Sequence, residues 1–333
     1  MPKPEHMTKE IFFPRRKSSK RIVMNELFCD ELFQHYPSSL DLEDLRLTYI
    51  NNCVLNSFLN YHTIIMNALM IHAIRRCSSQ PQTWKTFLLS LAVSDVGLGL
   101  VVQPFYTLLL VNWLQQNDSG CETIMIFQIL GNLFSTASFL GVVALSADRF
   151  LAVQLHLRYL VVVTHKRVVA VVISVWVVSG IVSLLTLWNL YETQRLIRIT
   201  GGVIGLLLTV LMYTKIYFVV RRHKIQIQTL RLQRGEQTCS MLSFDRLFNS
   251  VSGTFYVYLA FLVCYLPHII SLAAIKMNGS NISLKELFLY SLSILYLNSS
   301  LNPFIYCWKL RHIRCAIMDM LRSLAWKRNR TSN

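Results

Sequence analysis

The chain has 333 residues with a formal net charge of +16; 53% of the residues are hydrophobic and only 15% are charged. A soluble domain of ordinary composition carries about a quarter charged residues, so this composition excludes one. A basic chain could bind nucleic acid, but here the basic residues alternate with long apolar runs. That distribution favours a membrane protein and no nucleic-acid partner.

The first 47 residues change character at Met24. Residues 1–23 are basic and contain no apolar core of a signal peptide, whereas acidic residues follow Met24. Because a basic segment is difficult to translocate, we expect Met24 to be the physiological start of the protein. Residues 1–47 are expected to form a disordered extracellular segment, from which 1–23 are absent in the mature chain.

Seven apolar runs are long enough to cross about 30 Å of hydrocarbon as helices. Their approximate limits are 48–74, 84–110, 121–152, 167–188, 197–220, 251–276 and 284–307. Short connections leave no room for a second folded domain. We therefore expect an all-α membrane protein, with a seven-transmembrane helix bundle over 48–308 and a cytoplasmic amphipathic helix and tail over 309–333.

Basic residues concentrate in the first, third and fifth connections and after the last run, whereas the second connection, 111–120, has none. The positive-inside rule then places the N-terminus outside and the C-terminus inside, as in a multi-pass protein of the plasma membrane. The basic clusters also suit membrane lipids of an anionic inner leaflet, or a cytosolic protein partner.

Asp95 lies in the middle of the second run, where a carboxylate costs about 3 kcal/mol on insertion scales. Such a group needs a proton or buried partners. Oxygen-bearing side chains occur at a compatible depth, namely Asn67, Ser138, Asn298, Ser299 and Asn302. This set favours a sodium ion as a modulator, and the alternative is a neutral Asp95 in a structural hydrogen-bond network.

Two further features in the runs indicate moving parts. Asp148 and Arg149 adjoin where the third run meets the cytosol, so Arg149 can pair locally or turn toward another helix. The alternative for Arg149 is interfacial snorkelling. Pro267 and Pro303 each remove a backbone donor, so kinks are expected in the sixth and seventh runs. Phe261 and Tyr265 precede the first of these kinks.

The motifs together resemble a rhodopsin-like (class A) G-protein-coupled receptor over about 48–325. They are Leu91-Ala92-Val93-Ser94-Asp95, Asp148-Arg149-Phe150, Trp176, Tyr213, Cys264-Tyr265-Leu266-Pro267 and Asn302-Pro303-Phe304-Ile305-Tyr306. The resemblance implies an agonist site on the outer side and nucleotide exchange on a heterotrimeric G protein on the inner side. It also implies that Arg149, Tyr213 and Tyr306 regroup on activation, and that Leu157 docks into the G protein.

The resemblance further implies that residues 309–325 form a short helix parallel to the membrane. Apolar residues alternate there with basic ones, which independently supports an interfacial helix. The apolar positions are Leu310, Ile313, Ile317, Met320, Leu321 and Leu324.

Several departures narrow the resemblance. Residues 189–196 lack the cysteine that usually bridges the second outer loop to the third helix, Gly205 stands where proline is typical, and Tyr265 stands where tryptophan is commoner. These departures are similar to the melanocortin, cannabinoid, lysophospholipid and sphingolipid receptors, with some likeness to adenosine receptors around Tyr213. An orphan receptor related to this cluster is the expectation.

The ligand class stays open between lipid-like, peptide and small-molecule ligands. Gly131 stands where amine receptors have an aspartate, and Tyr296 stands where opsins have the retinal-binding lysine. A protonated amine and bound retinal are therefore both disfavoured as ligands. The outer half of the bundle offers polar residues that are individually more often packing residues than ligand contacts. They are Gln103, Tyr106, Gln128, Asn132, Ser135, Tyr265, His268 and Tyr296.

Modification sites follow from the expected topology. Cys29 and Cys121 are the only cysteines on the oxidising side, so they form the one plausible disulfide, although spacing alone does not establish proximity. Cys315 is a candidate for lipidation. The glycosylation motifs on the outer side begin at Asn117, Asn278 and Asn281.

Three other protein classes fit the sequence less well than a receptor does. A seven-span ion transporter or channel could use Asp95 in an ion path, but transporters tend to show repeated halves, and this chain shows none. A non-signalling receptor-like protein would not need Asp148 and Arg149 intact. The chain has no phosphate loop, metalloprotease helix or nucleophile elbow, so an enzyme is not expected. Cys264 and His268 lack further ligands, so no metal site is expected.

Overall fold

The computed structural model describes residues 36, 41–76, 81–117, 119–155, 158–188, 190–234, 239–309, 313–320 and 322, and, within these, all side chains except 191 and 223–250. We refer to these as the described residues. The predicted helix and tail after residue 309 and the N-terminal segment fall largely outside them.

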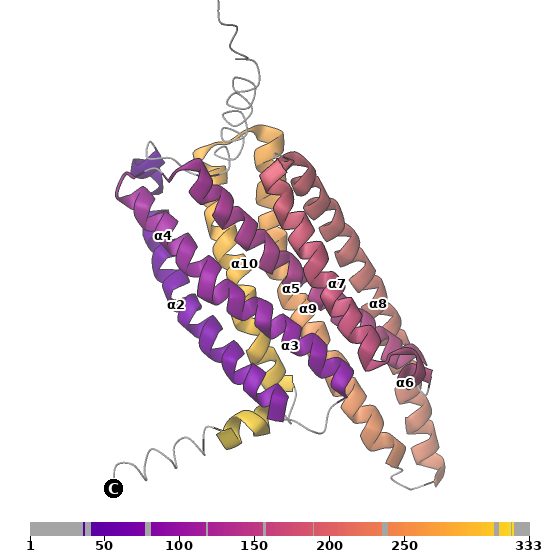
Figure 1. The fold of residues 1–333 in the computed structure, drawn as a ribbon. Coiled ribbons are helices and arrows are strands. Elements are labelled where there is room, and N and C mark those ends of the chain that lie inside the picture. Colours follow the sequence, from indigo (N-terminus) through magenta and orange to yellow (C-terminus); the bar gives the residue numbers. More distant parts are fainter. Residues whose placement is uncertain are drawn as a thin grey trace, which may run out of the picture.

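Seven long helical spans lie alongside one another in a single bundle (Figure 1). They are α2 (Leu42–Arg76); α3 (Gln82–Gly97) continuing through the π-helical turn η2 (Leu98–Val102) into α4 (Gln103–Leu114); α5 (Cys121–Leu155); α7 (His165–Leu184) ending in the 3-10 turn η4 (Leu185–Trp188); α8 (Tyr191–Arg234); α9 (Cys239–Asn278); and α10 (Ile282–Lys309). The short α6 (Tyr159–Val162) connects α5 to α7. The predicted all-α seven-helix fold is confirmed.

Five of these spans are apolar enough to be recognised as membrane-crossing by length and composition within the described residues. They are Gln82–Leu114, Cys121–Leu155, His165–Trp188, Glu192–Arg222 and Val251–Asn278. The remaining two, α2 and α10, are more polar because they share a buried polar seam.

The polar seam joins the facing sides of α2 and α10. Asn56 Nδ2 donates to Ser293 Oγ at 2.6 Å, and the hydroxyls of Thr63 and Ser300 lie 2.6 Å apart. One turn further, Asn67 Nδ2 donates to the backbone oxygen of Ser299 at 2.9 Å. Interhelical hydrogen bonds in a membrane contribute about 0.6 kcal/mol each, so the seam offsets part of the cost of inserting polar helices.

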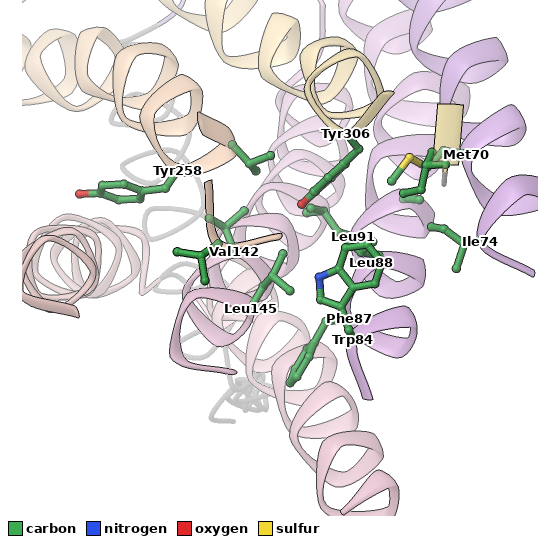
Figure 2. Packing of buried hydrophobic residues seen from close by; sticks show 14 of the residues in the cluster. Met70, Ile74, Trp84, Phe87, Leu88, Leu91, Val142, Leu145, Tyr258 and Tyr306 are labelled. Atoms are coloured by element: carbon green, nitrogen blue, oxygen red, sulfur yellow. The ribbon is translucent and has the colours of Figure 1, made fainter. Parts of the chain in front are cut away.

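The buried apolar side chains form two clusters, one toward each end of the bundle. We call the cluster that contains Tyr306 the inner cluster and the cluster that contains Tyr106 the outer cluster. Figure 2 shows the inner cluster, with Met70 and Ile74 of α2, Leu88 and Leu91 of α3 and Tyr306 of α10 among its members. The outer cluster joins α2, α4, α5 and α10.

A polar layer separates the two clusters. On α3, Asp95 lies between Leu91 of the inner cluster and Leu98 of the outer one. On α10, Asn298 and Asn302 likewise lie between Tyr296 of the outer cluster and Tyr306 of the inner cluster. The buried carboxylate therefore lies between two apolar clusters.

Residues 313–320 form a helix after α10. Ile313, Ile317 and Met320 are buried at i, i+4 and i+7, which is one face of a helix. Ile313 and Ile317 belong to the inner cluster with Tyr306. Three of the apolar positions predicted for this segment, Leu310, Leu321 and Leu324, lie outside the described residues.

Candidate functional site

The outer half of the bundle encloses a cavity of about 280 Å³ between α5, α7, α8, α9 and α10. Six of the eight predicted ligand residues line it: Gln128, Asn132, Ser135, Tyr265, His268 and Tyr296. Gly131, which replaces an amine-binding aspartate, also lies in the wall. The helices thus place most of the predicted residues around one space.

The other two predicted ligand residues, Gln103 and Tyr106, do not line this cavity. Both side chains are fully buried on α4. The Tyr106 hydroxyl donates to the backbone oxygen of Leu289 at 3.1 Å, and its ring stacks on Phe127. Tyr106 therefore holds α4 against α5 and α10.

Two lining residues were not anticipated from the sequence. Tyr36, which precedes the first helix, donates to Gln128 Oε1 at 2.8 Å and packs its ring against Phe288. Its contact with a residue 92 positions later has no sequence signature. The second residue is Arg198 on α8. A basic residue inside an expected span was an available signal, because intramembrane charges mark functional sites.

His268 is buried against α10. Its Nδ1 lies 3.2 Å from Ser291 Oγ, and its ring is 5.6 Å from the ring of Phe288. The side chain therefore both lines the cavity and links α9 to α10, so a ligand contact at His268 would act on the packing of these two helices.

Three aromatic rings form the floor of the cavity. Phe261 and Tyr265 stack with centroids 4.0 Å apart, and Phe139 of α5 lies 5.3 Å from the first and 6.0 Å from the second. The Tyr265 hydroxyl donates to the backbone oxygen of Ser135 at 2.8 Å. The rings connect the ligand cavity to the part of α9 that precedes Pro267.

Gly205 of α8 makes room for this floor. A Cβ atom at this position would lie 2.5 Å from Cζ of Phe139. The glycine found where the family usually has proline therefore has a steric reason: the Phe139 ring occupies the space.

We predict that Gly205→Ala displaces the Phe139 ring onto Phe261 and Tyr265. Overpacking of this kind costs about 1–3 kcal/mol. The expected results are a lower melting temperature and altered basal nucleotide exchange. Gly201→Ala is the matched control on the same helix, because nothing lies within 4 Å of a Cβ there. Equal melting and exchange for the two variants would contradict the prediction.

Asp95 is fully buried in the polar layer below the floor. Asn302 Nδ2 donates to Asp95 Oδ2 at 2.8 Å, and Ser138 and Ser299 lie close to the same carboxyl group. Asn67, by contrast, bonds to the backbone of α10 rather than to Asp95. Four buried oxygens have no hydrogen-bond partner among the described residues: Asp95 Oδ1, Ser138 Oγ, Asn298 Oδ1 and Asn302 Oδ1.

At the inner end of α5, Arg149 pairs with its neighbour Asp148. Arg149 Nε donates to Asp148 Oδ2 at 3.0 Å, and Nη2 contacts the same oxygen. The other carboxylate oxygen accepts a hydrogen bond from the Tyr159 hydroxyl at 2.7 Å. Both members of the pair are buried. The predicted G-protein contact Leu157 lies outside the described residues.

Tyr159 stays a donor across the physiological pH range. Burial raises the pKa of its phenol to about 12, and its hydroxyl also lies 3.4 Å from Thr83 Oγ1. Tyr159 therefore ties Asp148 to both α6 and α3.

We predict that Tyr159→Phe raises basal nucleotide exchange. The variant keeps the ring but removes one of the donors that hold Asp148, so the Asp148–Arg149 pair is less tightly fixed. Nucleotide exchange without added ligand is the measurement, and Thr83→Val, which removes only the longer contact of Tyr159, is the control. A basal rate no higher than that of the unaltered protein would refute the prediction.

Tyr213 and Tyr306 lie near Arg149 without bonding to it in the described contacts. Both are close enough for electrostatic interaction with Arg149. The Tyr213 hydroxyl lies 3.3 Å from Ser146 Oγ of α5, whereas the buried Tyr306 hydroxyl has no hydrogen-bond partner among the described residues. Figure 2 shows the Tyr306 ring reaching from α10 into the inner cluster.

Two further motif residues have structural contacts. Trp176 Nε1 of α7 donates to Ser90 Oγ of α3 at 3.1 Å. Pro267 lies inside α9 and Pro303 inside α10.

The predicted modification sites are only partly described. Cys121 is disulfide-bonded, and its predicted partner Cys29 lies outside the described residues. Asn117, Asn278 and Asn281 are exposed near the outer ends of their helices. Cys315 is a free, exposed cysteine.

The arrangement of these layers defines a class: a seven-helix membrane protein with a ligand-sized cavity at one end and a buried ion pair at the other. The chain belongs to the rhodopsin family of seven-transmembrane receptors, whose pattern, 7 transmembrane receptor (rhodopsin family), matches residues 66–196 and 189–306.

Curated relatives agree with this membership. The chain is 23% identical over 285 residues to the adenosine receptor A3 of Bos taurus, and this alignment covers 78% of the chain and 86% of the relative. It is 22% identical over 297 residues to the adenosine receptor A2a of Canis lupus familiaris, covering 80% and 70%. A shorter match of 37% over 97 residues links it to the dopamine receptor 2 of Drosophila melanogaster, covering 28% and 17%.

The chain is therefore a class A G-protein-coupled receptor that converts ligand binding into activation of a G protein. The seven-span transporter or channel is not favoured. Membership of this family implies a membrane receptor rather than an enzyme.

Proposed function

We propose that this receptor resides in the plasma membrane with its N-terminus outside, and that an extracellular ligand in the cavity frees Arg149 to bind the C-terminal helix of a Gα subunit. The observation that carries the proposal is the buried Asp148–Arg149 pair, held by Tyr159 and placed near Tyr213 and Tyr306 as alternative partners. A charged pair with alternative partners gives two states of similar energy, as a switch requires.

The aromatic floor provides the connection between the cavity and the switch. A ligand that contacts Tyr265 or His268 bears directly on α9, because both residues lie on that helix and line the cavity. Rotation of the inner part of α9 about Pro267 would then separate Tyr258 and Tyr213, whose rings stack 5.5 Å apart. Tyr213 would become available to Arg149.

The polar layer fits a sodium ion as an allosteric modulator. A hard cation takes oxygen ligands, and among the described residues Asp95 Oδ1 and three oxygens of the same polar layer, on Ser138, Asn298 and Asn302, have no hydrogen-bond partner. Asp95, Ser138, Asn298 and Asn302 would hold the ion, with Ser299 beside them. A bound cation would neutralise Asp95 and stabilise the arrangement in which α3, α5 and α10 stay close together.

Reconstituted nucleotide exchange tests the proposed function. Full-length receptor in phosphatidylcholine nanodiscs would be mixed with each class of purified heterotrimeric G protein, and GTP-analogue binding would be measured. We expect exchange above the receptor-free rate for at least one heterotrimer. Folded receptor that accelerates exchange on none of them, with or without ligands, would refute the proposal.

A further inference from the structure

Arg198 is the one charged residue in the wall of the ligand cavity, as far as the described residues show. It lies on α8, about 9 Å along the helix axis from Glu192. Glu192 is already paired with Arg195 and Lys276, and Arg198 has no ion-pair partner among the described residues. A guanidinium keeps its charge in a protein, so the cavity is electropositive.

The hydrogen bonds of Arg198 leave one specific edge of its guanidinium unused. Nη1 donates to Asn132 Oδ1, whereas Nε and Nη2 are buried and have no partner among the described residues. Nε and Nη2 share one edge of the planar group and present two parallel N–H bonds. That edge is the fork that binds a carboxylate or phosphate with two hydrogen bonds.

Asn132 adds a third donor to the same place. Its oxygen faces Arg198, so its Nδ2 group faces away, and this nitrogen is also buried without a partner among the described residues. The unused groups of Arg198 and Asn132 are therefore all donors. An unpaired buried charge is costly, and a ligand that only accepts hydrogen bonds and carries negative charge would remove that cost.

Polar side chains such as Gln128, His268 and Tyr296 also line the cavity, but the wall on the α8 side beyond Arg198 is apolar. After Arg198, the α8 wall includes Ile199, Gly201, Gly202 and Leu206, and Phe139 and Ile269 line the same cavity. The two glycines leave space in the wall: a Cβ at Gly202 would lie 3.7 Å from Ile269, and a Cβ at Gly201 would meet nothing within 4 Å. An alkyl or similar apolar body fits this region, and a uniformly polar ligand does not.

The cavity wall also reaches the lateral surface of the bundle. Val178 of α7 and Ile197 of α8 line the cavity and are 46% and 41% exposed. In a membrane this surface faces lipid. A ligand with an apolar tail could therefore occupy the cavity while its tail extends between α7 and α8.

We propose that the receptor binds an amphipathic anion, with its carboxylate or phosphate head on the Nε–Nη2 edge of Arg198 and on Asn132 Nδ2, and its apolar chain along Gly201, Gly202 and Leu206. This assignment rests on the proposed function of the cavity as the ligand site. It distinguishes the chain from receptors of neutral nucleosides, since a neutral ligand would leave the Arg198 charge unpaired.

Thermal melting of full-length receptor in phosphatidylcholine nanodiscs tests the assignment. Two anionic amphiphiles, hexadecanoate and a lysophosphatidate with the same chain, differ in their anionic head. Hexadecanol and hexadecylamine keep the chain and change the charge. Butyrate and adenosine are the controls without a long chain. We expect stabilisation by one or both anionic amphiphiles, and which of them binds more tightly identifies the head. The other four probes should have little effect.

Three variants locate the contacts. Arg198→Gln should weaken binding of the anionic amphiphile by about tenfold or more, because the charged fork is lost. Arg198→Lys should recover part of the affinity, since it keeps the charge without the fork. Arg195→Gln removes the same charge one turn earlier on α8, outside the cavity, and should bind like the unaltered receptor. Gly202→Leu fills the apolar region and should weaken binding of the chain while Arg198 remains.

Melting of each variant without ligand shows whether it is folded. The assignment is overturned if neither anionic amphiphile stabilises the unaltered receptor, if hexadecanol stabilises it equally, or if Arg198→Gln binds the anion as tightly as Arg195→Gln does. The assignment would also be overturned if adenosine bound tightly and Arg198→Gln left its affinity unchanged. Nucleotide exchange in the same nanodiscs separates the two proposals: exchange that persists without any anion effect rejects only the ligand, whereas stabilisation without exchange rejects only the signalling function.

Discussion

Arg149→Ala should reduce nucleotide exchange on the coupled G protein to the receptor-free rate while leaving the receptor at the cell surface. The variant removes the side chain that we propose binds Gα in the active state. It leaves Asp148 with its hydrogen bond from Tyr159, so the inner end of α5 stays connected to α6. The measurement is GTP-analogue binding with purified receptor, together with surface labelling of intact cells.

Arg167→Ala is the matched control, because it removes the same charge from an exposed residue on the same side of the bundle. Arg167 Nη1 donates to the backbone oxygen of Val162 and does not contact the switch. We expect nearly normal exchange from this variant. Exchange by Arg149→Ala at the level of the Arg167→Ala control would show that Arg149 is a structural residue.

Asp95→Asn should remove the response of the receptor to sodium. The substitution keeps the size of the side chain and its hydrogen bond with Asn302, but removes the negative charge that would attract the ion. In the unaltered receptor we expect sodium to raise the melting temperature and lower basal exchange. Saturation at about a hundred times the dissociation constant corresponds to about 2.7 kcal/mol of stabilisation.

Potassium and N-methylglucamine at equal ionic strength separate the specific site from general screening. Ser299→Ala provides a graded comparison, because Ser299 lies beside the carboxyl group but its hydroxyl is not among the unpartnered oxygens. It should retain more of the sodium response than Asp95→Asn does. An identical sodium response in the unaltered receptor and Asp95→Asn would mean that the polar layer is a structural hydrogen-bond network.

The fold was predictable because hydrophobic length is a strong signal. Five spans are recognisable from composition alone. The remaining two, α2 and α10, are more polar, and their polar side chains form hydrogen bonds with each other. The span limits were less predictable. For example, α8 runs from Tyr191 to Arg234, beyond the expected span of 197–220 at both ends.

The site was predictable where motifs fixed both depth and direction. Asp95 and Asn302 meet at 2.8 Å, as their positions in two spans suggested. Gln103 and Tyr106 are fully buried but do not line the cavity, and their sequence positions do not show which neighbouring helices they contact.

Tyr36 and Arg198 show two different limits of sequence reasoning. The contact of Tyr36 with Gln128 depends on how the N-terminal segment meets the bundle, and no periodicity encodes it. Arg198 was visible as a charge in an apolar run, yet only its hydrogen bonds show which edge of the guanidinium is unused. Coordinates were necessary for the ligand assignment, whereas the receptor class was accessible from motifs.

The most direct test of the switch is a distance between the inner ends of α2 and α9, measured by double electron–electron resonance. Spin labels at Arg76→Cys and Ser252→Cys, with other reactive cysteines replaced, report whether α9 moves away from a fixed helix. We predict a longer distance when a nucleotide-free G protein is bound, and loss of that population when Arg149→Ala is added. An unchanged distance with the G protein bound would contradict the account.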